Sequence, residues 1–228
     1  MAASEPRTLG GSIVLGARAL AASALDWLAP RGCAACDASL ARRAIFCAAC
    51  AATVERHGAD AGAFPAGALY AGAVADAIAR LKYGGRADVG AALGELLLRV
   101  DLAPFDLVVP VPLHPLRLAE RGFNQAALLA RPLVRTGARF APRALRRTRP
   151  TSQQTRLSRV ERLENVACAF AASSAVRGAR VVIVDDVVTT GATLSACCDA
   201  ARDAGARSAF GVAVAAAPDG HFLSRVSG

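Results

Sequence analysis

The feature that most constrains the fold is an apolar run that ends in two adjacent acids and continues into a turn rich in threonine and glycine. The run covers Arg180 to Asp185 (RVVIVD), and the chain then reads DVVTTGATL as far as Leu194. A short continuous apolar run is typical of a parallel strand that is buried on both faces. The turn leads into a helix expected over about Gly191 to Ala204. The pattern therefore predicts a strand, a turn and a helix at the carboxyl edge of a parallel sheet.

Strands and helices also alternate elsewhere. The further strands expected are Ala68 to Tyr70, Asp106 to Val111 and about Ser208 to Ala215, and the further helices are Ala73 to Lys82, Asp88 to Val100 and Asn124 to Thr136. This alternation predicts an α/β fold with a parallel sheet. We expect residues 61–228 to form that domain. Residues 1–60 would hold an N-terminal helix and a metal module, followed by the small-residue linker Gly58 to Gly67.

The segment Leu9 to Pro30 is apolar, but Arg18 and Asp26 interrupt it and most of its residues are small. It lacks the roughly 20 strongly apolar residues that a membrane-spanning helix needs. Four of its residues fall on one face of a helix: Leu20, Ala24, Trp27 and Leu28. We therefore expect an amphipathic helix that packs on the rest of the protein, no transmembrane segment, and a cytoplasmic location.

Four of the seven cysteines form the pattern C-x2-C-x10-C-x2-C: Cys33, Cys36, Cys47 and Cys50. Paired thiolates at this spacing are typical of a tetrahedral zinc site. Because four protein ligands leave no open position, the zinc would be structural. The alternatives are a redox CxxC motif and unligated thiols. Cys168, Cys197 and Cys198 lack such spacing and are expected to be small buried residues.

The turn after the apolar run carries a candidate binding site: Asp185, Asp186, Thr189, Thr190, Gly191, Ala192 and Thr193. Consecutive backbone N–H groups and hydroxyls at a helix N-terminus suit a phosphate. Carboxylates accept hydrogen bonds and so suit the hydroxyls of a ribose beside that phosphate. An ordinary helix cap would account for one acid, but not for two acids followed by TTGAT.

Basic residues are unevenly distributed. The net charge of +9 suits a polyanionic partner, and nine arginines lie between Arg135 and Arg162 against the single acid Glu161. A solvated arginine-rich loop is the alternative interpretation. Lys82 is the one lysine among 27 basic residues, and it is a candidate phosphate contact unless its presence is a matter of chance.

The stretch from Val181 to Leu194 resembles the phosphoribosyl-pyrophosphate (PRPP) motif of the type I phosphoribosyltransferases. A narrower resemblance is to the ComF family, named for competence for DNA uptake. It rests on the cysteine module, on the 154–170 segment with Gln154, Leu157, Arg162, Asn165 and Phe170, and on the short motifs LKYG (81–84), VPVPLH (109–114) and RGFNQ (121–125).

This resemblance implies PRPP binding with Mg2+ and a role for Arg121 beside the two acids. It implies a pyrophosphate-binding loop over Pro110 to Arg121, with His114 as a candidate base and Arg117 nearby, and a mobile flap over Arg146 to Arg159. Three functions stay open: a phosphoribosyltransferase with an unidentified acceptor, a non-catalytic competence factor that binds single-stranded DNA beside a helicase-like partner, and a PRPP-sensing regulator.

Overall fold

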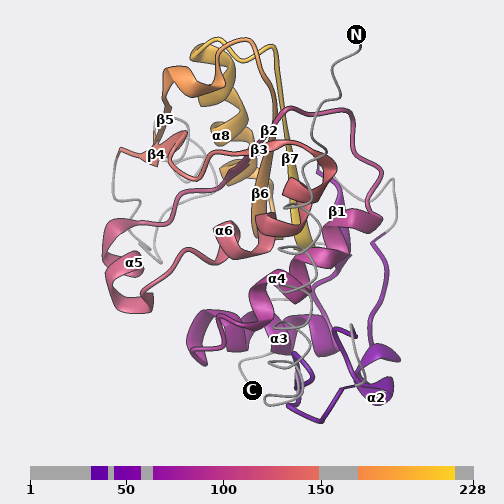
Figure 1. Cartoon of the computed structure of the whole chain (residues 1–228). Coiled ribbons are helices and arrows are strands. Elements are labelled where there is room, and N and C mark those ends of the chain that lie inside the picture. The colour runs from indigo at the N-terminus through magenta and orange to yellow at the C-terminus, as the bar shows by residue number, and fades with distance from the viewer. Residues whose placement is uncertain (1–31, 41–43, 58–63, 149–168, 219–228) are drawn as a thin grey trace, which may run out of the picture.

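The structure, a computed structural model, describes residues 32–40, 44–57, 64–148 and 169–218 (Figure 1). Three of the sequence predictions lie outside these residues. They are the N-terminal helix, the burial of Cys168, and the part of the arginine segment from Arg149 to Arg162.

A five-stranded parallel sheet forms the centre of the molecule, in the order β1-β7-β6-β2-β3. Its strands are β1 (Ala66–Leu69), β2 (Leu107–Pro110), β3 (Arg139–Phe140), β6 (Arg180–Val188) and β7 (Ser208–Ala216). The predicted parallel α/β fold is confirmed. The strand β3 was not expected from the sequence, and β6 continues beyond the predicted end at Asp185.

The longer β6 is explained by its neighbour. Beyond Asp185, the residues Val187 and Val188 remain in register with Ala215 and Ala216 of β7. The two acids therefore lie inside a paired strand, and the turn begins only after Val188. Asp185 and Asp186 consequently point to opposite faces of the sheet, because side chains alternate along a strand.

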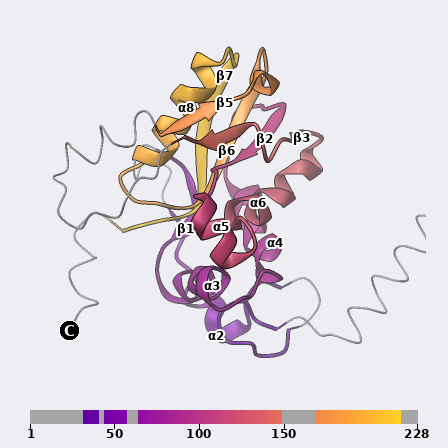
Figure 2. The same ribbon diagram turned by 90° about the vertical axis from the view of Figure 1, so that its left-hand side faces the viewer.

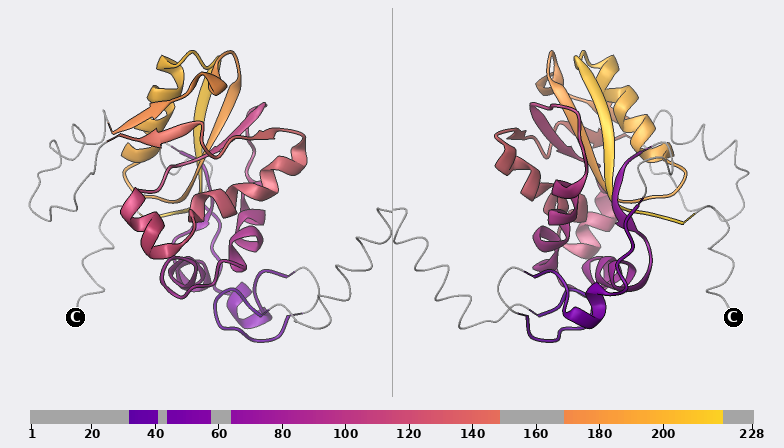
Figure 3. Two further views of the ribbon diagram at one scale, coloured as in Figure 1. Left: turned by 60° about the vertical axis from the view of Figure 1, so that its left-hand side comes forward. Right: turned by 90° about the vertical axis from the view of Figure 1, so that its right-hand side faces the viewer.

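Two hydrophobic cores lie on the two faces of this sheet. Val182 and Val184 of β6 pack in the core on the side of α3 (Gly72–Tyr83), α4 (Val89–Gly94) and α6 (Gln125–Ala130). Val181 and Ile183 pack in the other core, with α8 (Ala192–Asp203). Figure 3 shows α8 on one side of the strands and α4 and α6 on the other. The all-apolar pattern of residues 181–184 (VVIV) reflects this two-sided burial.

Two predicted helices end in tighter 3-10 turns. The helix expected over Asp88 to Val100 is α4 followed by η1 (Glu95–Arg99), and that expected over Asn124 to Thr136 is α6 followed by η2 (Arg131–Thr136). Gly94 is a weak helix former at the first junction, and Pro132 lacks an amide donor at the second.

The loop expected from Pro110 to Arg121 contains the helix α5 (Pro115–Arg121). Its signals are present in the sequence: proline stands at the first helical position, and Gly122 ends the helix with a φ of 78°. The start of the expected flap is also ordered. Leu145–Arg147 forms β4, which pairs antiparallel with β5 (Phe170–Ala172), while η3 (Ser174–Val176) leads toward β6.

The cysteine segment, with the short helix α2 (Ala48–Ala51), packs against α3. Cys33, Ala34 and Phe46 belong to the same hydrophobic core as α3, and Nη1 of Arg80 donates to the carbonyl oxygen of Ala35 at 2.7 Å. Figures 1 and 2 both place α2 at the end of the molecule remote from the β4–β5 ribbon. Among the described residues, no helix is long and apolar enough to cross a membrane.

Candidate functional site

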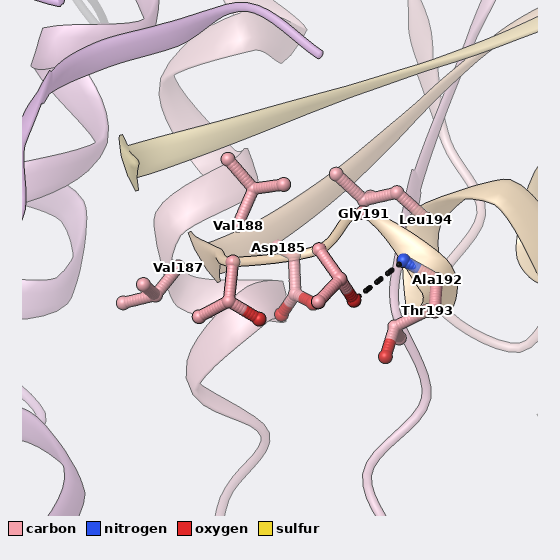
Figure 4. Close-up of a pocket in the computed structure, with 9 residues that line it drawn as sticks. Asp185, Val187, Val188, Gly191, Ala192, Thr193 and Leu194 are labelled. Carbon is pink, nitrogen blue, oxygen red and sulfur yellow. Dashed lines mark hydrogen bonds between the residues drawn. The ribbon is translucent and has the colours of Figure 1, made fainter. Parts of the chain in front are cut away.

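The turn between β6 and α8 forms a pocket at the carboxyl edge of the sheet (Figure 4). Gly191 is the residue before α8 and has a φ of 77°, a conformation that favours glycine. A Cβ at this position would also lie 2.8 Å from the ring of Phe64. The N–H of Ala192 donates to Oγ1 of Thr190 at 3.4 Å, the contact dashed in Figure 4.

The pocket gathers most of the residues predicted for the site. It is lined by Asp185, Val187, Val188, Thr189, Thr190, Gly191, Ala192, Thr193 and Leu194. Hydroxyls and backbone amides at the start of α8, a helix of 12 residues, give the pocket the character of an anion site. Three residues that were predicted for the site do not line the pocket: Asp186, Lys82 and Arg121.

Asp186 is held on the opposite side of β6 by two protein donors. Nζ of Lys82 lies 2.8 Å from its Oδ1, and Nε2 of Gln125 donates to its Oδ2 at 2.8 Å. Only 5% of Asp186 is exposed. Both oxygens of this buried carboxyl group thus have a donor, which offsets the cost of burying the group. Asp186 therefore organises the interior beside the pocket.

Asp185 has a different environment. Its Oδ1 accepts the N–H of Asp186 at 2.8 Å, and its side chain lines the pocket. Burial, together with the charge of Asp186, raises the pKa of Asp185 well above the usual range of a carboxyl group. Of the two acids, Asp185 is thus the one available to a ligand.

The role of Gln125 was not predicted from the sequence, although the residue belongs to the RGFNQ motif. Its Oε1 accepts a hydrogen bond of 2.6 Å from Nη1 of Arg121, and the guanidinium carbon of Arg121 lies 5.6 Å from the centre of the Tyr83 ring. Contacts thus run continuously from Lys82 through Asp186 and Gln125 to Arg121. A glutamine four positions after Arg121, at a predicted helix start, could have drawn attention, but its other partner, Asp186, is 61 positions away.

The four cysteines predicted as metal ligands converge. Their sulfur atoms all lie within 4.8 Å of one another, and those of Cys36 and Cys47 are 3.7 Å apart. Tetrahedral zinc with Zn–S bonds of ~2.3 Å would separate its sulfurs by about 3.8 Å. The N–H of Cys47 donates to the sulfur of Cys33 at 3.4 Å. Burial opposes ionisation, yet backbone N–H groups lower the pKa of Cys33 to about 6. The cluster can hold a metal ion such as zinc.

Comparisons with known proteins identify a domain family and several relatives. Residues 118–224 match the phosphoribosyl transferase domain family. The DNA utilization protein YhgH of Escherichia coli (strain K12) is 39% identical over 135 residues, which are 55% of this chain and 60% of the relative. The competence protein ComFC of Bacillus subtilis (strain 168) is 35% identical over 88 residues, or 39% of this chain and 35% of the relative.

The chain is similar to proteins named for competence and for DNA utilization, in agreement with the resemblance to the ComF family. Competence protein F of Haemophilus influenzae is a further relative, 36% identical over 40% of this chain and 41% of its own length. The chain thus spans 60% or less of each of these three relatives. A solved glutamine PRPP amidotransferase from B. subtilis covers 69% of this chain and 33% of its own, with 22% identity and a TM-score of 0.41. The fold assignment rests instead on the parallel sheet and the family match.

Two further residues that were expected near the site have ordinary partners. Nδ1 of His114, which is part-exposed, accepts the N–H of Leu116 at 3.3 Å and so caps the N-terminus of α5. Arg117 pairs with Glu120 at 3.6 Å on the surface of the same helix. The ring nitrogen Nδ1 of His114 is therefore occupied by the cap.

Arg147 of β4 is less ordinary. Its guanidinium carbon lies 5.6 Å from the centre of the Phe170 ring, and its buried Nε has no hydrogen-bond partner among the described residues. Burial lowers the pKa of Arg147, while the charge of Asp185 opposes that effect. Because Arg147 packs against a ring, substitution at this position would disturb packing as well as charge.

Proposed function

We propose that the chain binds PRPP together with Mg2+ in the pocket between β6 and α8. The observation that carries the proposal is the combination of Asp185 with the Thr189–Thr193 turn at a helix N-terminus. The amides and hydroxyls of the turn would bind the 5′-phosphate, and Asp185 would accept hydrogen bonds from the ribose hydroxyls. The match to the phosphoribosyl transferase domain supports this assignment.

Within this proposal, basic residues near the pocket would bind the leaving group, pyrophosphate. Arg121 would face the pyrophosphate, and Lys82 would contact a phosphate if the ligand drew it away from Asp186. Transfer would consist of attack by an acceptor on C1′ of the ribose as the bond to pyrophosphate breaks, with preorganised charge stabilising the oxocarbenium-like state. Bound Mg2+ would supply further positive charge, held by PRPP oxygens and water.

The cellular role that we propose is in the uptake or use of DNA in the cytoplasm, since relatives are named for competence and DNA utilization. A second candidate function, binding of single-stranded DNA beside a helicase-like partner, is favoured by one observation. Arg139, Arg143 and Arg146 are exposed, and these three have no ion pair among the described residues. PRPP sensing without transfer is the third candidate.

The proposal includes two structural parts. Residues 1–60 would form a zinc-stabilised module, with zinc bound by Cys33, Cys36, Cys47 and Cys50, and residues 61–228 would form the PRPP-binding domain. Four thiolates that complete the coordination sphere suit a structural metal, and the free energy of zinc binding would contribute to folding.

The direct test is a thermal-shift titration with PRPP and Mg2+ on two glycine variants. Gly191→Ala places a Cβ against Phe64 at a positive φ, so affinity should fall at least tenfold. Gly178→Ala is the matched control, because Gly178 also has a positive φ, 71°, but open space around it. Equal affinities in the two variants would contradict the proposed site. Pyrophosphate release with a panel of acceptors then separates a transferase from a sensor.

A further inference from the structure

Gln125 lies between two charged groups, and only a side chain with both a donor and an acceptor satisfies them. Its Nε2 donates to Oδ2 of Asp186 at 2.8 Å, and its Oε1 accepts from Nη1 of Arg121 at 2.6 Å. Gln125 is 7% exposed, so neither contact is easily replaced by water. The charged neighbours also fix which way the amide points.

Among the residues connected through Gln125, Arg121 is the one that reaches the surface. It is partly exposed, it lies over the ring of Tyr83, and it has no ion pair among the described residues. A guanidinium held in place without a counter-ion is prepared to bind an anion, since no existing salt bridge has to be broken. The contact that holds it is the hydrogen bond to Gln125.

We propose that Gln125 is a positioning residue that fixes Arg121 relative to Asp186 and so prepares Arg121 to bind the pyrophosphate group of PRPP. The proposal rests on the proposed function for its ligand, but the contacts themselves do not depend on a ligand. The charged and titratable groups that face Gln125 or its two partners are Asp185, Asp186, Lys82, Arg121 and Tyr83.

Two substitutions that are similar in size to glutamine distinguish a positioning role of Gln125 from a role in packing alone. Gln125→Met keeps the volume but removes both hydrogen bonds. Gln125→Glu keeps an acceptor for Arg121 but, when ionised, places a carboxylate against Asp186. When protonated, the introduced carboxyl again has one donor and one acceptor, as the amide has. The Gln125→Glu variant should therefore recover as the pH falls, which a space-filling role does not predict.

The experiment is calorimetric titration with PRPP and Mg2+ at pH 6 and pH 8.5, with each variant compared with wild type at the same pH. We expect Gln125→Met to weaken binding about tenfold at both pH values, the equivalent of one hydrogen bond to a charged group. Gln125→Glu should show a similar loss at pH 8.5 and a smaller one at pH 6. Arg99→Met, a change at an exposed residue of η1 outside the proposed site, should bind as wild type. Wild-type affinity in Gln125→Met, or a loss in Gln125→Glu that is independent of pH, would overturn the proposal.

A ligand-free measurement keeps this inference distinct from the proposed function. In NMR spectra, the guanidinium protons of Arg121 should exchange slowly with solvent in wild type and at least tenfold faster in Gln125→Met. Faster exchange without PRPP binding by wild type would support the positioning of Arg121 and overturn PRPP as the ligand. Unchanged exchange would overturn the positioning role whatever the protein binds.

Discussion

The ammonium group of Lys82 lies 2.8 Å from Oδ1 of Asp186, although 104 positions separate the two residues in the sequence. This contact joins the end of α3 to the strand β6. Burial opposes the charge on Lys82, but Asp186 more than offsets it and raises the pKa of Lys82. The one lysine of the chain thus pairs with the interior acid of the site.

Removal of Lys82 should therefore destabilise the fold. Lys82→Met leaves a buried carboxylate with Gln125 alone, so we expect a loss of about 3 kcal/mol in the free energy of unfolding, the lower end for breaking a buried pair. Urea denaturation measures the loss. Arg117→Met, which removes an exposed pair with Glu120, should cost less than about 1 kcal/mol. Equal losses in the two variants would contradict the role of Lys82.

Zinc should be present at about one ion per chain. Elemental analysis of wild-type protein tests this, and Cys36→Ser should reduce the zinc content and lower solubility, because one ligand is lost and the module shares the core of α3. Cys198→Ala, a buried cysteine outside the cluster, should keep its zinc. A folded wild-type protein without metal would refute the zinc assignment.

The raised pKa of Asp185 makes stability depend on pH. In the unfolded chain the carboxyl ionises at its ordinary pKa near 3.8, whereas in the folded protein its pKa is about 8. The unfolded state therefore loses its proton first, and folding becomes less favourable as the pH rises from about 4 to about 8. Asp185→Asn lacks this penalty. Its stability relative to wild type should increase over that range, and parallel stability curves would count against the burial of Asp185.

Exposed arginines should make any contact with single-stranded DNA electrostatic. Each neutralised phosphate contributes a slope of roughly −0.7 in log K against log salt. Fluorescence anisotropy with a labelled oligonucleotide should show this dependence. Affinity should fall when Arg139, Arg143 and Arg146 are changed to Ala, and it should survive changes at Asp185 and Asp186. An affinity that is independent of salt, or that is lost in the acid variants alone, would exclude the DNA surface. Arg147 is a poor choice for this experiment because it packs on Phe170.

Local patterns predicted the parts of the fold that depend on neighbouring residues. The apolar run before Asp185 identified β6, and the spacing of Cys33, Cys36, Cys47 and Cys50 identified the cluster that the structure brings together. The helix α5 was missed even though Pro115 and Gly122 are standard signals for a helix start and end.

The separation of the two acids could not be predicted in the same way. Asp185 and Asp186 are adjacent, and the sequence analysis assigned them one role. Their environments differ because β6 is paired through both positions and directs one side chain to each face. The partners of Asp186 are 104 and 61 positions away, at Lys82 and Gln125, and a spacing of that kind has no local signature.

The central claim is that PRPP binds through Asp185 and the Thr189–Thr193 turn, and calorimetry with PRPP and Mg2+ tests it most directly. At pH 9, where Asp185 with its pKa of about 8 is ionised, charge-assisted hydrogen bonds contribute about 1.5–3 kcal/mol each, so the Asp185→Asn/Asp186→Asn double variant should bind at least tenfold more weakly than wild type. Asp185→Asn alone should account for most of that loss. Unchanged affinity in the double variant, with the protein still folded, would place the PRPP site elsewhere.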